Sequence, residues 1–421
     1  MKCKLTYIWL LLLIFVSKIN AQETLWTLDT SFFTDTMYLN ETELSLVNLS
    51  YNTIENDNSL QKVYKQLQAI EEGANQTISI VHIGDSHIQA DMLTGNVRTN
   101  LQKKFGNAGR GLVFPFKVAR TNEPIDFRTS TNTLWEVNKN IQKNHTAPVG
   151  IAGISVKTIN PGSEIRIELS PNDSMDYSFN SMDIIFDKND SSYNIELFDA
   201  DTNMLQFISS HDDYVSKLST TAFLNTYNNS VTLRCSMQDS CENSFVFYGV
   251  VLKNENPGVL YHAIGVNGAA FNHYFYNNFY EQLQLLEPSL VIVSLGTNDG
   301  YSAAFKPQDF ERYISIFIEK LTMELPNASI LFTTPPDCYK NGQKVNNLQI
   351  IREIIIKKCI ENNFAYWDFY NVMGGYGSMQ NWYNQGYSAK DKVHFPAKAY
   401  RLQGKLLSNA LLNSYNKYAN N

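Results

Sequence analysis

The chain has 421 residues, more than one average domain holds, so two or more structural units are expected. Hydrophobic residues make up 43% of it and aromatic residues 13%, which is enough for sizeable buried cores. The formal net charge is −7, and no basic cluster stands out along the sequence. A chain with this charge pattern is not expected to bind nucleic acid.

The first 21 residues have the features of a secretory signal peptide. Lys2 and Lys4 give a positive start, residues 7–16 are apolar, and Ala21 offers a small residue at the expected cleavage point. Cleavage would remove three lysines and no acids, which takes the formal charge from −7 to −10. A membrane anchor is the alternative, but the apolar stretch is short for a spanning helix. We therefore expect a secreted or periplasmic protein without a membrane span after cleavage, and its oligomeric state stays open.

Export would place the four remaining cysteines where disulfides can form. Cys235 and Cys241 would close a short loop, and Cys338 with Cys359 would make the second pair. Three pairings are formally possible, and four free buried thiols are the alternative. Because no CxxC spacing occurs, a thiolate metal site is not expected.

Residues 22–75 are expected to form an N-terminal extension with one helix. Its first part, residues 22–57, is polar, rich in Asn and Thr, and only weakly periodic. Apolar side chains then recur at helical spacing over residues 58–72, and Gly73 is a typical stop.

Residues 76–120 and 259–421 predict a parallel α/β domain. The apolar run Ile78–Ile83 is typical of a strand buried on both faces, and a helical pattern follows it. Strands and helices alternate again after residue 258, which indicates one parallel sheet with helices on both faces. Helices are predicted over 273–286, 307–325, 344–362 and 396–416, and strands over 290–293, 330–332 and 364–369.

Residues 121–258 interrupt that alternation. Short segments of alternating character, such as Glu164–Leu169 and Asn194–Leu197, are separated by Asn, Asp, Ser and Gly. This pattern predicts an all-β module of the sandwich or jelly-roll type. We expect it to be inserted into a surface loop of the α/β domain, where insertions are well tolerated.

Ser86 follows Gly84 and Asp85 at the point where the first predicted strand gives way to a helix. In open α/β sheets the ligand crevice lies at the carboxyl ends of the strands. A helix N-terminus also offers backbone N–H groups to an anion. Ser86 is therefore placed to attack a carbonyl, with its own N–H directed at the resulting oxyanion. Alternatively, Asp85 and Ser86 only cap the helix.

Two further motifs can supply donors for an oxyanion. Asn298 follows another predicted strand, and its side-chain amide can donate to the oxyanion or simply close an Asx turn. Gly268 can bring a backbone N–H close, because no Cβ blocks the approach. Gly265, three residues earlier, is the rival for that role, and the sequence does not decide between them.

His394 lies three residues after Asp391, just before the last predicted helix. A serine hydroxyl is a weak nucleophile that an adjacent imidazole activates. The imidazole in turn needs a carboxylate to orient it and to stabilise its charged form, and Asp391 is close enough to do so. The alternative is a surface aspartate and a helix-capping histidine. This chemistry requires no metal and no organic cofactor.

These four motifs, in this order, resemble the SGNH or GDSL hydrolase superfamily, whose four blocks carry Ser, Gly, Asn and His. The resemblance covers about residues 76–120 and 259–421 and implies a three-layer α/β/α hydrolase domain. It implies a catalytic triad and an oxyanion hole formed by Ser86, Asp391, His394, Gly268 and Asn298.

Finer features are similar to those of bacterial peptidoglycan O-acetylesterases. They are the stretch Gly84–Asp91, the glycine-rich residues 106–111 and a β insertion that in those enzymes resembles a carbohydrate-binding module. This similarity implies a serine esterase that removes acetyl groups from a cell-wall polysaccharide. Asp299 stands where Glu is frequent, and Ile88 and Gln89 stand where small residues are frequent. The substrate therefore stays open between peptidoglycan, acetyl-xylan and other glycans, as does transfer of acetyl to a sugar instead of water.

Two other site chemistries compete with this interpretation. His82, Asp85 and His87 are close enough in sequence for a metallophosphoesterase, but Thr297 stands where its motif needs a histidine. The loop 106–111 is rich in glycine like a phosphate-binding loop, yet it lacks the Lys-Ser/Thr ending.

A third alternative is a polysaccharide-binding protein without catalytic activity on a hydrolase scaffold. Against it, a competent residue fills every expected catalytic position. Trp382 and Tyr383 precede the histidine loop, where they can stack on a sugar ring or merely pack that loop.

Overall fold

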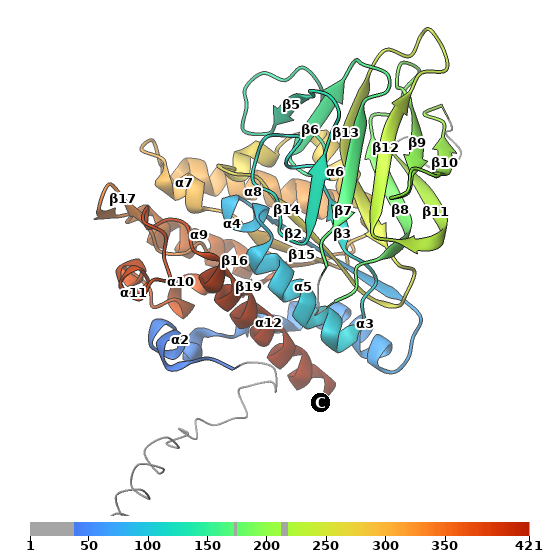
Figure 1. Cartoon of the computed structure of the whole chain (residues 1–421). Coiled ribbons are helices and arrows are strands. Elements are labelled where there is room, and N and C mark those ends of the chain that lie inside the picture. The colour runs from blue at the N-terminus through green and yellow to red at the C-terminus, as the bar shows by residue number, and fades with distance from the viewer. Residues whose placement is uncertain (1–37, 172–174, 212–217, 421) are drawn as a thin grey trace, which may run out of the picture. The chain divides into compact units, whose positions relative to one another are not determined.

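The computed structural model describes residues 38–171, 175–211 and 218–420 (Figure 1). The predicted signal peptide and the start of the N-terminal extension lie outside these ranges. The chain divides into two units, Met1–Met37 and Tyr38–Asn421, and all described helices and strands belong to the second.

A six-stranded sheet forms the centre of the α/β part, in the order β1-β19-β16-β15-β2-β14. The five strands from β19 to β14 run parallel, and only the edge strand β1 is antiparallel. This arrangement confirms the predicted parallel α/β fold. The strands, in sheet order, are β1 (Ile54–Glu55), β19 (Ala365–Trp367), β16 (Ser329–Thr333), β15 (Leu290–Ser294), β2 (Thr77–Gly84) and β14 (Gly258–Gly265).

The order of the parallel strands determines where a ligand can bind. Counted along the chain, β14-β2-β15-β16-β19 reads 2-1-3-4-5, a doubly wound sheet. Its winding reverses between β2 and β15, and ligands bind outside the carboxyl ends of the strands at such a reversal. Ser86 follows β2 and Asn298 follows β15, so the topology alone brings these two predicted site residues together.

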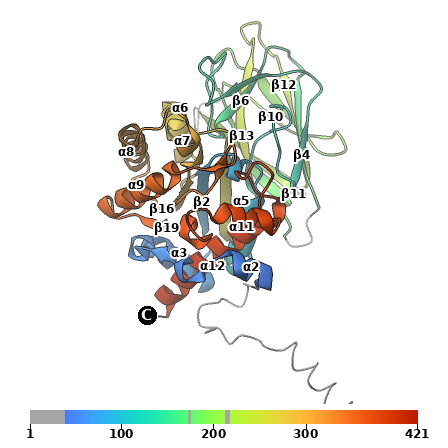
Figure 2. The same cartoon turned by 90° about the vertical axis from the view of Figure 1, so that its left-hand side faces the viewer.

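Helices cover both faces of this sheet (Figures 1 and 2). Helices α3, α5 and α12 contact one another on one face, whereas α6, α8 and α9 form a row on the other. Among the helices of the described ranges, none combines the length and apolar character that a bilayer crossing needs. The main helices are α3 (Gln61–Glu71), α5 (Met92–Phe105), α6 (Asn277–Gln284), α8 (Pro307–Glu324), α9 (Asn347–Glu361) and α12 (Ala397–Ala419).

Several short elements surround the carboxyl ends of the strands and were not predicted. Helix α11 lies beside α2 on the face shown in Figure 2. These elements, with the 3-10 turns of the chain, are α4 (Ser86–Gln89), α7 (Thr297–Tyr301), α10 (Phe369–Val372), α11 (Ser378–Asn384), the hairpin β17 (Tyr339–Lys340) to β18 (Gln343–Lys344), η2 (Leu49–Tyr51), η3 (Asp57–Leu60) and η4 (Phe271–Tyr274).

The N-terminal extension is more ordered than the one predicted helix. Besides α3 it forms α2 (Glu41–Leu46) and the edge strand β1. The Asn40 side chain accepts the N–H of Glu43, and the Glu43 carboxylate accepts the N–H of Asn40. The capping-box pattern of Asn40 and Glu43 could have predicted the start of this helix, but the segment's polar, weakly periodic composition favoured an irregular structure.

The segment between β2 and β14 folds largely as two antiparallel sheets, as the sequence predicts. These two sheets are called the β part, and the six-stranded sheet with its helices is called the α/β part. Buried side chains from both antiparallel sheets join one core with those of β2, β14 and β15, so the β part packs directly on the α/β part. One sheet has the order β10 (Met204–Ile208), β9 (Asn194–Phe198), β12 (Ser230–Ser236), β7 (Glu164–Leu169), β4 (Phe127–Ser130). The other has β11 (Ser219–Asn228), β8 (Phe179–Phe186), β13 (Phe245–Lys253), β6 (Ile154–Thr158), β5 (Glu136–Lys139), with β3 (Gly111–Val113) also paired to β13.

The pairing of β3 with β13 begins the β structure at Gly111, ahead of residue 121, where the module was expected to start. Glycine permits this junction. An ideal Cβ on Gly109 would lie 2.5 Å from the carbonyl oxygen of Leu252, and Gly109 has a φ of +128°. The glycine-rich loop 106–111 is thus a close backbone crossing between the two parts of the fold.

The predicted disulfides are wrong, because all four cysteines are free thiols. Cys235 points into the core of the β part, whereas Cys241 is exposed and its thiol contacts the carbonyl oxygen of Asp190 at 3.4 Å. Cys359 belongs to the main core, and Cys338 belongs to a separate small cluster under the β17–β18 hairpin.

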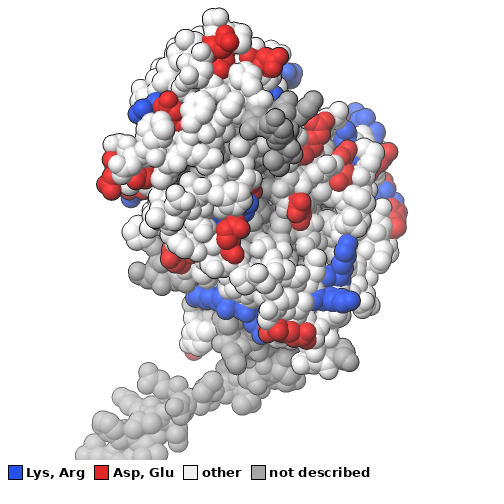
Figure 3. Space-filling model, turned by 90° about the vertical axis from the view of Figure 1, so that its right-hand side faces the viewer, with Lys and Arg blue, Asp and Glu red and all other residues white. Residues whose placement is uncertain are grey.

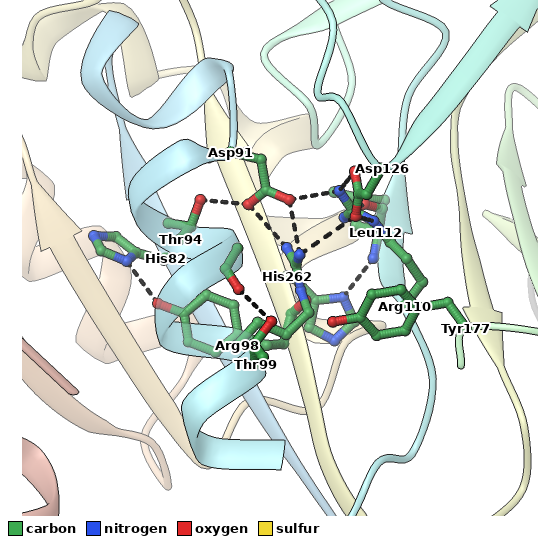
Figure 4. A network of polar contacts seen from close by, with 12 residues as sticks. His82, Asp91, Thr94, Arg98, Thr99, Arg110, Leu112, Asp126, Tyr177 and His262 are labelled. Atoms are coloured by element: carbon green, nitrogen blue, oxygen red, sulfur yellow. Dashed lines mark hydrogen bonds and ion pairs between the residues drawn. The ribbon is translucent and has the colours of Figure 1, made fainter. Parts of the chain in front are cut away.

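A buried network of four charges joins the two parts (Figure 4). Asp91, the residue before α5, contacts Arg98 at 2.8 Å and Arg110 at 2.6 Å. Arg110 also contacts Asp126, which directly precedes β4, at 2.9 Å. Burial alone would raise the pKa of Asp91, but the two guanidinium groups outweigh it and hold that pKa below its ordinary value. The network therefore ties the start of α5 to the start of the β part.

Replacing Arg110 with Met should destabilise the protein by about 3–5 kcal/mol, because Asp91 and Asp126 would lose a buried partner. The measurement is the free energy of unfolding in denaturant. Arg312→Met is the control, since its pair with Asp309 is 60% and 45% exposed and should contribute less than about 0.5 kcal/mol. Equal losses in the two variants would contradict a joining role for the network.

Candidate active site

Ser86 is presented by a tight turn between β2 and α4. Asp85 caps α4, because its carboxylate accepts the N–H of His87 at 2.9 Å. Gly84 is required for close packing, since an ideal Cβ there would lie 2.3 Å from the side chain of Ile88. Gly84 therefore allows close packing at this turn and Asp85 caps the helix that follows it. Ser86 remains partly exposed at the end of the turn.

The structure brings Ser86, His394 and Asp391 together in a hydrogen-bonded row. Ser86 Oγ lies 3.0 Å from His394 Nε2, and His394 Nδ1 lies 2.7 Å from Asp391 Oδ2. The other carboxylate oxygen of Asp391 accepts the N–H groups of Val393 and His394, both at 3.0 Å. The side chains of His394 and Asp391 are 44% and 51% exposed, so the row opens to solvent.

The electrostatics of this row suit base catalysis. Partial burial would raise the pKa of Asp391, but hydrogen bonds from the His394 ring and from two backbone N–H groups lower it overall. Asp391 therefore stays ionised at neutral pH and accepts the proton on Nδ1. That leaves Nε2 of a neutral His394 as the acceptor that faces the Ser86 hydroxyl.

His87 packs against His394, with their ring centres 5.6 Å apart. Its Nδ1 lies 3.0 Å from the hydroxyl of Tyr400 on α12. Burial, with a smaller contribution from His394, lowers the pKa of His87 to about 3. A neutral ring thus supports the exposed imidazole without placing a competing positive charge beside it.

The metal cluster considered from the sequence does not assemble. The two ring nitrogens of His82 lie 2.7 Å from the Tyr261 hydroxyl and 2.6 Å from the Ser294 hydroxyl, inside the sheet. Burial lowers the pKa of His82 to about 3, which keeps it neutral. His82, Asp85 and His87 therefore each bond to different neighbours instead of converging on one point. The phosphate-binding alternative for the glycine-rich loop 106–111 is not favoured either. The loop's arginine, Arg110, is already paired with Asp91 and Asp126 in the four-charge network.

The structure separates the two glycines that the sequence left open. Gly265 is buried against α4, where an ideal Cβ would lie 2.3 Å from the backbone nitrogen of Gln89. Gly268 is exposed at a φ of +83°, and an ideal Cβ there would have no neighbour closer than 4.0 Å. Gly265 therefore serves packing, and Gly268 lies in the open turn from which an N–H can reach a ligand.

Two amide side chains hold the turn around Gly268 from both sides. Gln89 accepts the N–H of Asn267 at 2.8 Å, and Asn298 donates to the carbonyl oxygen of Ala269 at 2.9 Å. Asn267 and Ala269, the neighbours of Gly268 in the chain, are thus tied to α4 and to α7. This role of Gln89 was not predicted from the sequence, where the only signal was a glutamine at a position at which small residues are frequent.

Gln89 also connects the site to the β part. Its side-chain nitrogen donates to the hydroxyl of Thr121 and to the side chain of Asn122, both at 2.8 Å. Asn267 donates to the same Asn122 oxygen at 2.6 Å. Three segments therefore meet at one glutamine that is only 2% exposed: the serine turn, the Gly268 turn and the chain leading into β4.

Asn298 lies where the sequence predicts an oxyanion donor, but both of its amide hydrogens are engaged. Besides Ala269, its nitrogen donates to Asp85 Oδ2 at 3.2 Å. Since both partners are acceptors, the nitrogen must face them. To donate to an oxyanion, Asn298 would release one of these bonds, and the longer bond to Asp85 is the weaker one.

Of the two aromatic residues noted in the sequence, Trp382 and Tyr383, one is buried and the other is at the surface. Trp382 is fully buried, and its indole N–H donates to the carbonyl oxygens of Leu46 and Met373. Tyr383 is 39% exposed beside Lys392. Trp382 therefore packs the loop, and only Tyr383 can meet a ligand.

The chain was compared with known protein families. Residues 223–402 match the GDSL-like Lipase/Acylhydrolase family, a range that includes Gly268, Asn298, Asp391 and His394 and begins after Ser86. Over these residues the chain is similar to a GDSL-like hydrolase domain. The match confirms the resemblance inferred from the motifs and supports an esterase.

One solved structure shares the fold over most of the chain. This peptidoglycan O-acetylesterase is 24% identical with a TM-score of 0.70, covering 85% of this chain and 96% of its own. A GDSL-like lipase from Bacteroides thetaiotaomicron is 20% identical with a TM-score of 0.30, covering 36% and 75%. A family two carbohydrate esterase from Clostridium thermocellum is 14% identical with a TM-score of 0.27, covering 67% and 98%. The comparison with curated proteins found no matching relative.

Two carboxyl groups under the hydrolase site carry raised pKa values. Burial raises the pKa of Asp85 to about 7 and that of Asp299 to about 7. Asp299 Oδ2 is buried and has no hydrogen-bond partner among the described residues. Both groups therefore favour their protonated forms at mildly acidic pH.

Replacing Gln89 with Leu should lower kcat on a small activated acetyl ester by about 10- to 100-fold and leave KM nearly unchanged, because the Gly268 turn loses its anchor. Steady-state kinetics measure both constants. Gln102→Leu is the matched control, since Gln102 is also buried and donates to loop carbonyls at Gly109 and Val259, away from the site. A wild-type kcat in Gln89→Leu, or an equal loss in Gln102→Leu, would refute the positioning role.

Asp299→Asn should weaken the pH dependence of stability. With its pKa raised from 3.8 to about 7, Asp299 binds a proton in the folded state that the unfolded chain has already released. The free energy of unfolding therefore falls as pH rises from about 4 to about 7, by on the order of 1 kcal/mol per pH unit for this group. Denaturation across that range should show a shallower slope for Asp299→Asn and an unchanged slope for the exposed control Asp201→Asn.

Proposed function

We propose that the protein is an exported serine esterase that removes O-acetyl groups from a cell-wall polysaccharide, with peptidoglycan as its substrate. The observation that carries this proposal is the hydrogen-bonded row Ser86–His394–Asp391 at the switch point of the sheet. The peptidoglycan assignment is supported by the similarity to the peptidoglycan O-acetylesterase, which extends over the β part as well as the hydrolase domain.

The first step forms an acetyl-enzyme. Ser86 Oγ attacks the acetyl carbonyl carbon while its proton passes to His394 Nε2, 3.0 Å away. Negative charge collects on the carbonyl oxygen, where the N–H groups of Ser86 and Gly268 and the amide of Asn298 stabilise it. Asp391 stabilises the positive charge that His394 gains in this step.

Collapse of this intermediate completes the acetyl-enzyme, and a second step then releases acetate. The carbon–oxygen bond to the sugar breaks, and His394 returns its proton to the departing sugar hydroxyl. His394 then takes a proton from water, whose oxygen attacks the acetyl-enzyme, and Ser86 recovers a proton as acetate leaves. The balance is one water consumed and one acetate and one free hydroxyl produced, and no cofactor takes part.

Location and polymer binding are further parts of the proposal. The signal-like residues 1–21 support export to the periplasm or the medium. The β part lies beside the serine turn through Gln89 and Asn122, which supports a role in holding the polysaccharide. The arrangement of Ser86, His394 and Asp391 does not depend on which sugar carries the acetyl group, so acetyl-xylan and related polymers are the alternative substrates.

Ser86→Ala should reduce acetate release from O-acetylated peptidoglycan by at least about 1,000-fold, because the nucleophile is lost. Ser302→Ala, an exposed serine near Asn298, is the control and should keep wild-type activity. Released acetate is measured for peptidoglycan and for acetylated xylan in parallel. Faster release from xylan would move the substrate to another glycan. Serine-independent release, or none from any ester, would instead favour a binding protein without catalytic activity.

A further inference from the structure

We propose that four lysines beside the triad, Lys340, Lys344, Lys392 and Lys398, form a cationic rim that binds the carboxylate groups of an anionic acetylated glycan. This inference rests on the proposed function and adds the charge of the substrate to it. Together the four residues are termed the lysine rim.

The lysine rim lies against the loop that carries Asp391 and His394. Lys340 and Lys344 belong to the β17–β18 hairpin, and the N–H of Tyr339 in that hairpin donates to the carbonyl oxygen of Lys392 at 3.0 Å. Lys392 directly follows Asp391, and Lys398 lies in the first turn of α12, four residues after His394. The rim therefore borders the catalytic histidine through two separate elements and its own loop.

Each rim ammonium group is held over the face of a tyrosine ring. Such a contact orients a lysine but leaves its charge uncompensated, because the ring is neutral. The rings are Tyr301 for Lys340 at 4.5 Å, Tyr376 for Lys344 at 4.3 Å, Tyr383 for Lys392 at 4.6 Å and Tyr387 for Lys398 at 4.0 Å.

Among the described residues, none of the rim lysines forms an ion pair with a carboxylate. Their hydrogen bonds go to neutral groups instead, such as the carbonyl of Tyr301 for Lys340 and the side chain of Gln380 for Lys392. Other lysines of the chain do pair, for example Lys253 with Asp183 at 3.0 Å. The rim therefore keeps its positive charge available.

The segments that carry the rim contain more lysines than acidic residues. Residues 337–344 hold two lysines and one acid, Asp337, whose pKa is raised by burial although Lys344 acts to lower it. Residues 376–398 hold three lysines and one acid, Asp391, which is taken by His394. This contrasts with a chain of 41 acidic and 34 basic residues. On the face shown in Figure 3, by comparison, cationic and acidic side chains lie interspersed on a largely uncharged surface.

The chemistry of the rim favours a carboxylated sugar polymer over a simple anion. Tyr376 and Tyr383 are 50% and 39% exposed, so rings that can stack on sugars lie beside cations that attract carboxylates. A neutral acetylated glycan would gain nothing from the lysines. A carboxylate next to the acetylated sugar would be drawn toward the triad and would hold the ester near Ser86.

The test compares soluble O-acetylated peptidoglycan in three forms: with free peptide carboxylates, with these carboxylates amidated, and with the peptides removed so that only sugar carboxylates remain. The variant is Lys344→Gln/Lys398→Gln, which leaves the loop between Asp391 and His394 unchanged. Lys65→Gln/Lys103→Gln, at exposed positions of α3 and α5, removes the same charge elsewhere.

On the form with free carboxylates, KM of the rim variant should rise about three- to tenfold while kcat stays within about twofold, as expected for two exposed charge contacts. Its activity on the amidated form and on a small neutral acetyl ester should be unchanged, and the control variant should behave like wild type. Raising NaCl from about 50 to about 300 mM should increase KM of the wild type more than that of the rim variant. The form that keeps the effect identifies the peptide or the sugar as the source of the carboxylate.

Equal KM values for the rim variant and wild type on free carboxylates, or equal losses on the amidated form, would overturn the inference. Binding of the same three polymers to Ser86→Ala gives an answer that does not depend on turnover: binding must weaken on amidation and with the rim variant. If binding follows charge but no polymer is deacetylated, the proposed function fails and the rim stands. Stronger competition by a phosphate polymer than by carboxylated glycan would overturn the carboxylate assignment.

Discussion

The architecture depends on the neutralisation of one buried carboxylate, Asp91. It closes the serine turn, precedes α5, and is neutralised by Arg98 and Arg110 at 2.8 and 2.6 Å. Without two guanidinium groups, a carboxylate this deeply buried would have to bind a proton and lose its contacts. Because Arg110 also holds Asp126, the same neutralisation fixes the direction in which the chain leaves the hydrolase domain and enters the β part. The placement of Thr121 and Asn122 beside Gln89 depends on that direction, since both lie just before Asp126.

The large features of the fold could be predicted because they rest on local patterns. The run Ile78–Ile83 and its later counterparts are apolar on both faces, and helical periods separate them, which is enough to predict a parallel sheet. The proximity of Ser86, His394 and Asp391 was also predictable, since each lies directly after a strand or in a short loop with the right chemistry. The strand order adds the reason that Ser86 and Asn298 meet although 212 positions separate them along the chain.

What could not be predicted depends on contacts between distant segments. Gln89 looks like an ordinary helix residue until the Gly268 turn and Asn122 are placed around it. The choice between Gly265 and Gly268 likewise depends on which of them packs against α4. The cysteines were judged from compartment and spacing, but the burial of Cys235 and the exposure of Cys241 decide against that pair. The lysine rim escaped notice because its members are spread over some sixty positions and gather only when the hairpin folds back onto the histidine loop.

The two kinds of support around the triad differ in strength. Beneath it, His82 and His87 are neutral and bonded within the core, and Gln89 and Asn298 hold the Gly268 turn from both sides. Above it, tyrosine rings and lysines form a surface that can adapt to a polymer. The reacting atoms are therefore held by buried contacts, and the contacts that the proposed polymer would meet lie at the surface.

The openness of the triad bears on the fate of the acyl group. With about half of the His394 and Asp391 side chains exposed, the proposed acetyl-enzyme would face bulk water as soon as the sugar leaves. If the proposed acetyl-enzyme forms there, water is the nearest abundant nucleophile, which would favour hydrolysis over transfer to a second alcohol. The same openness lets the enzyme approach an acetyl group in the middle of a long or cross-linked chain, since no free end has to be threaded. An accessible surface site of this kind would suit the insoluble cell-wall substrate that is proposed above.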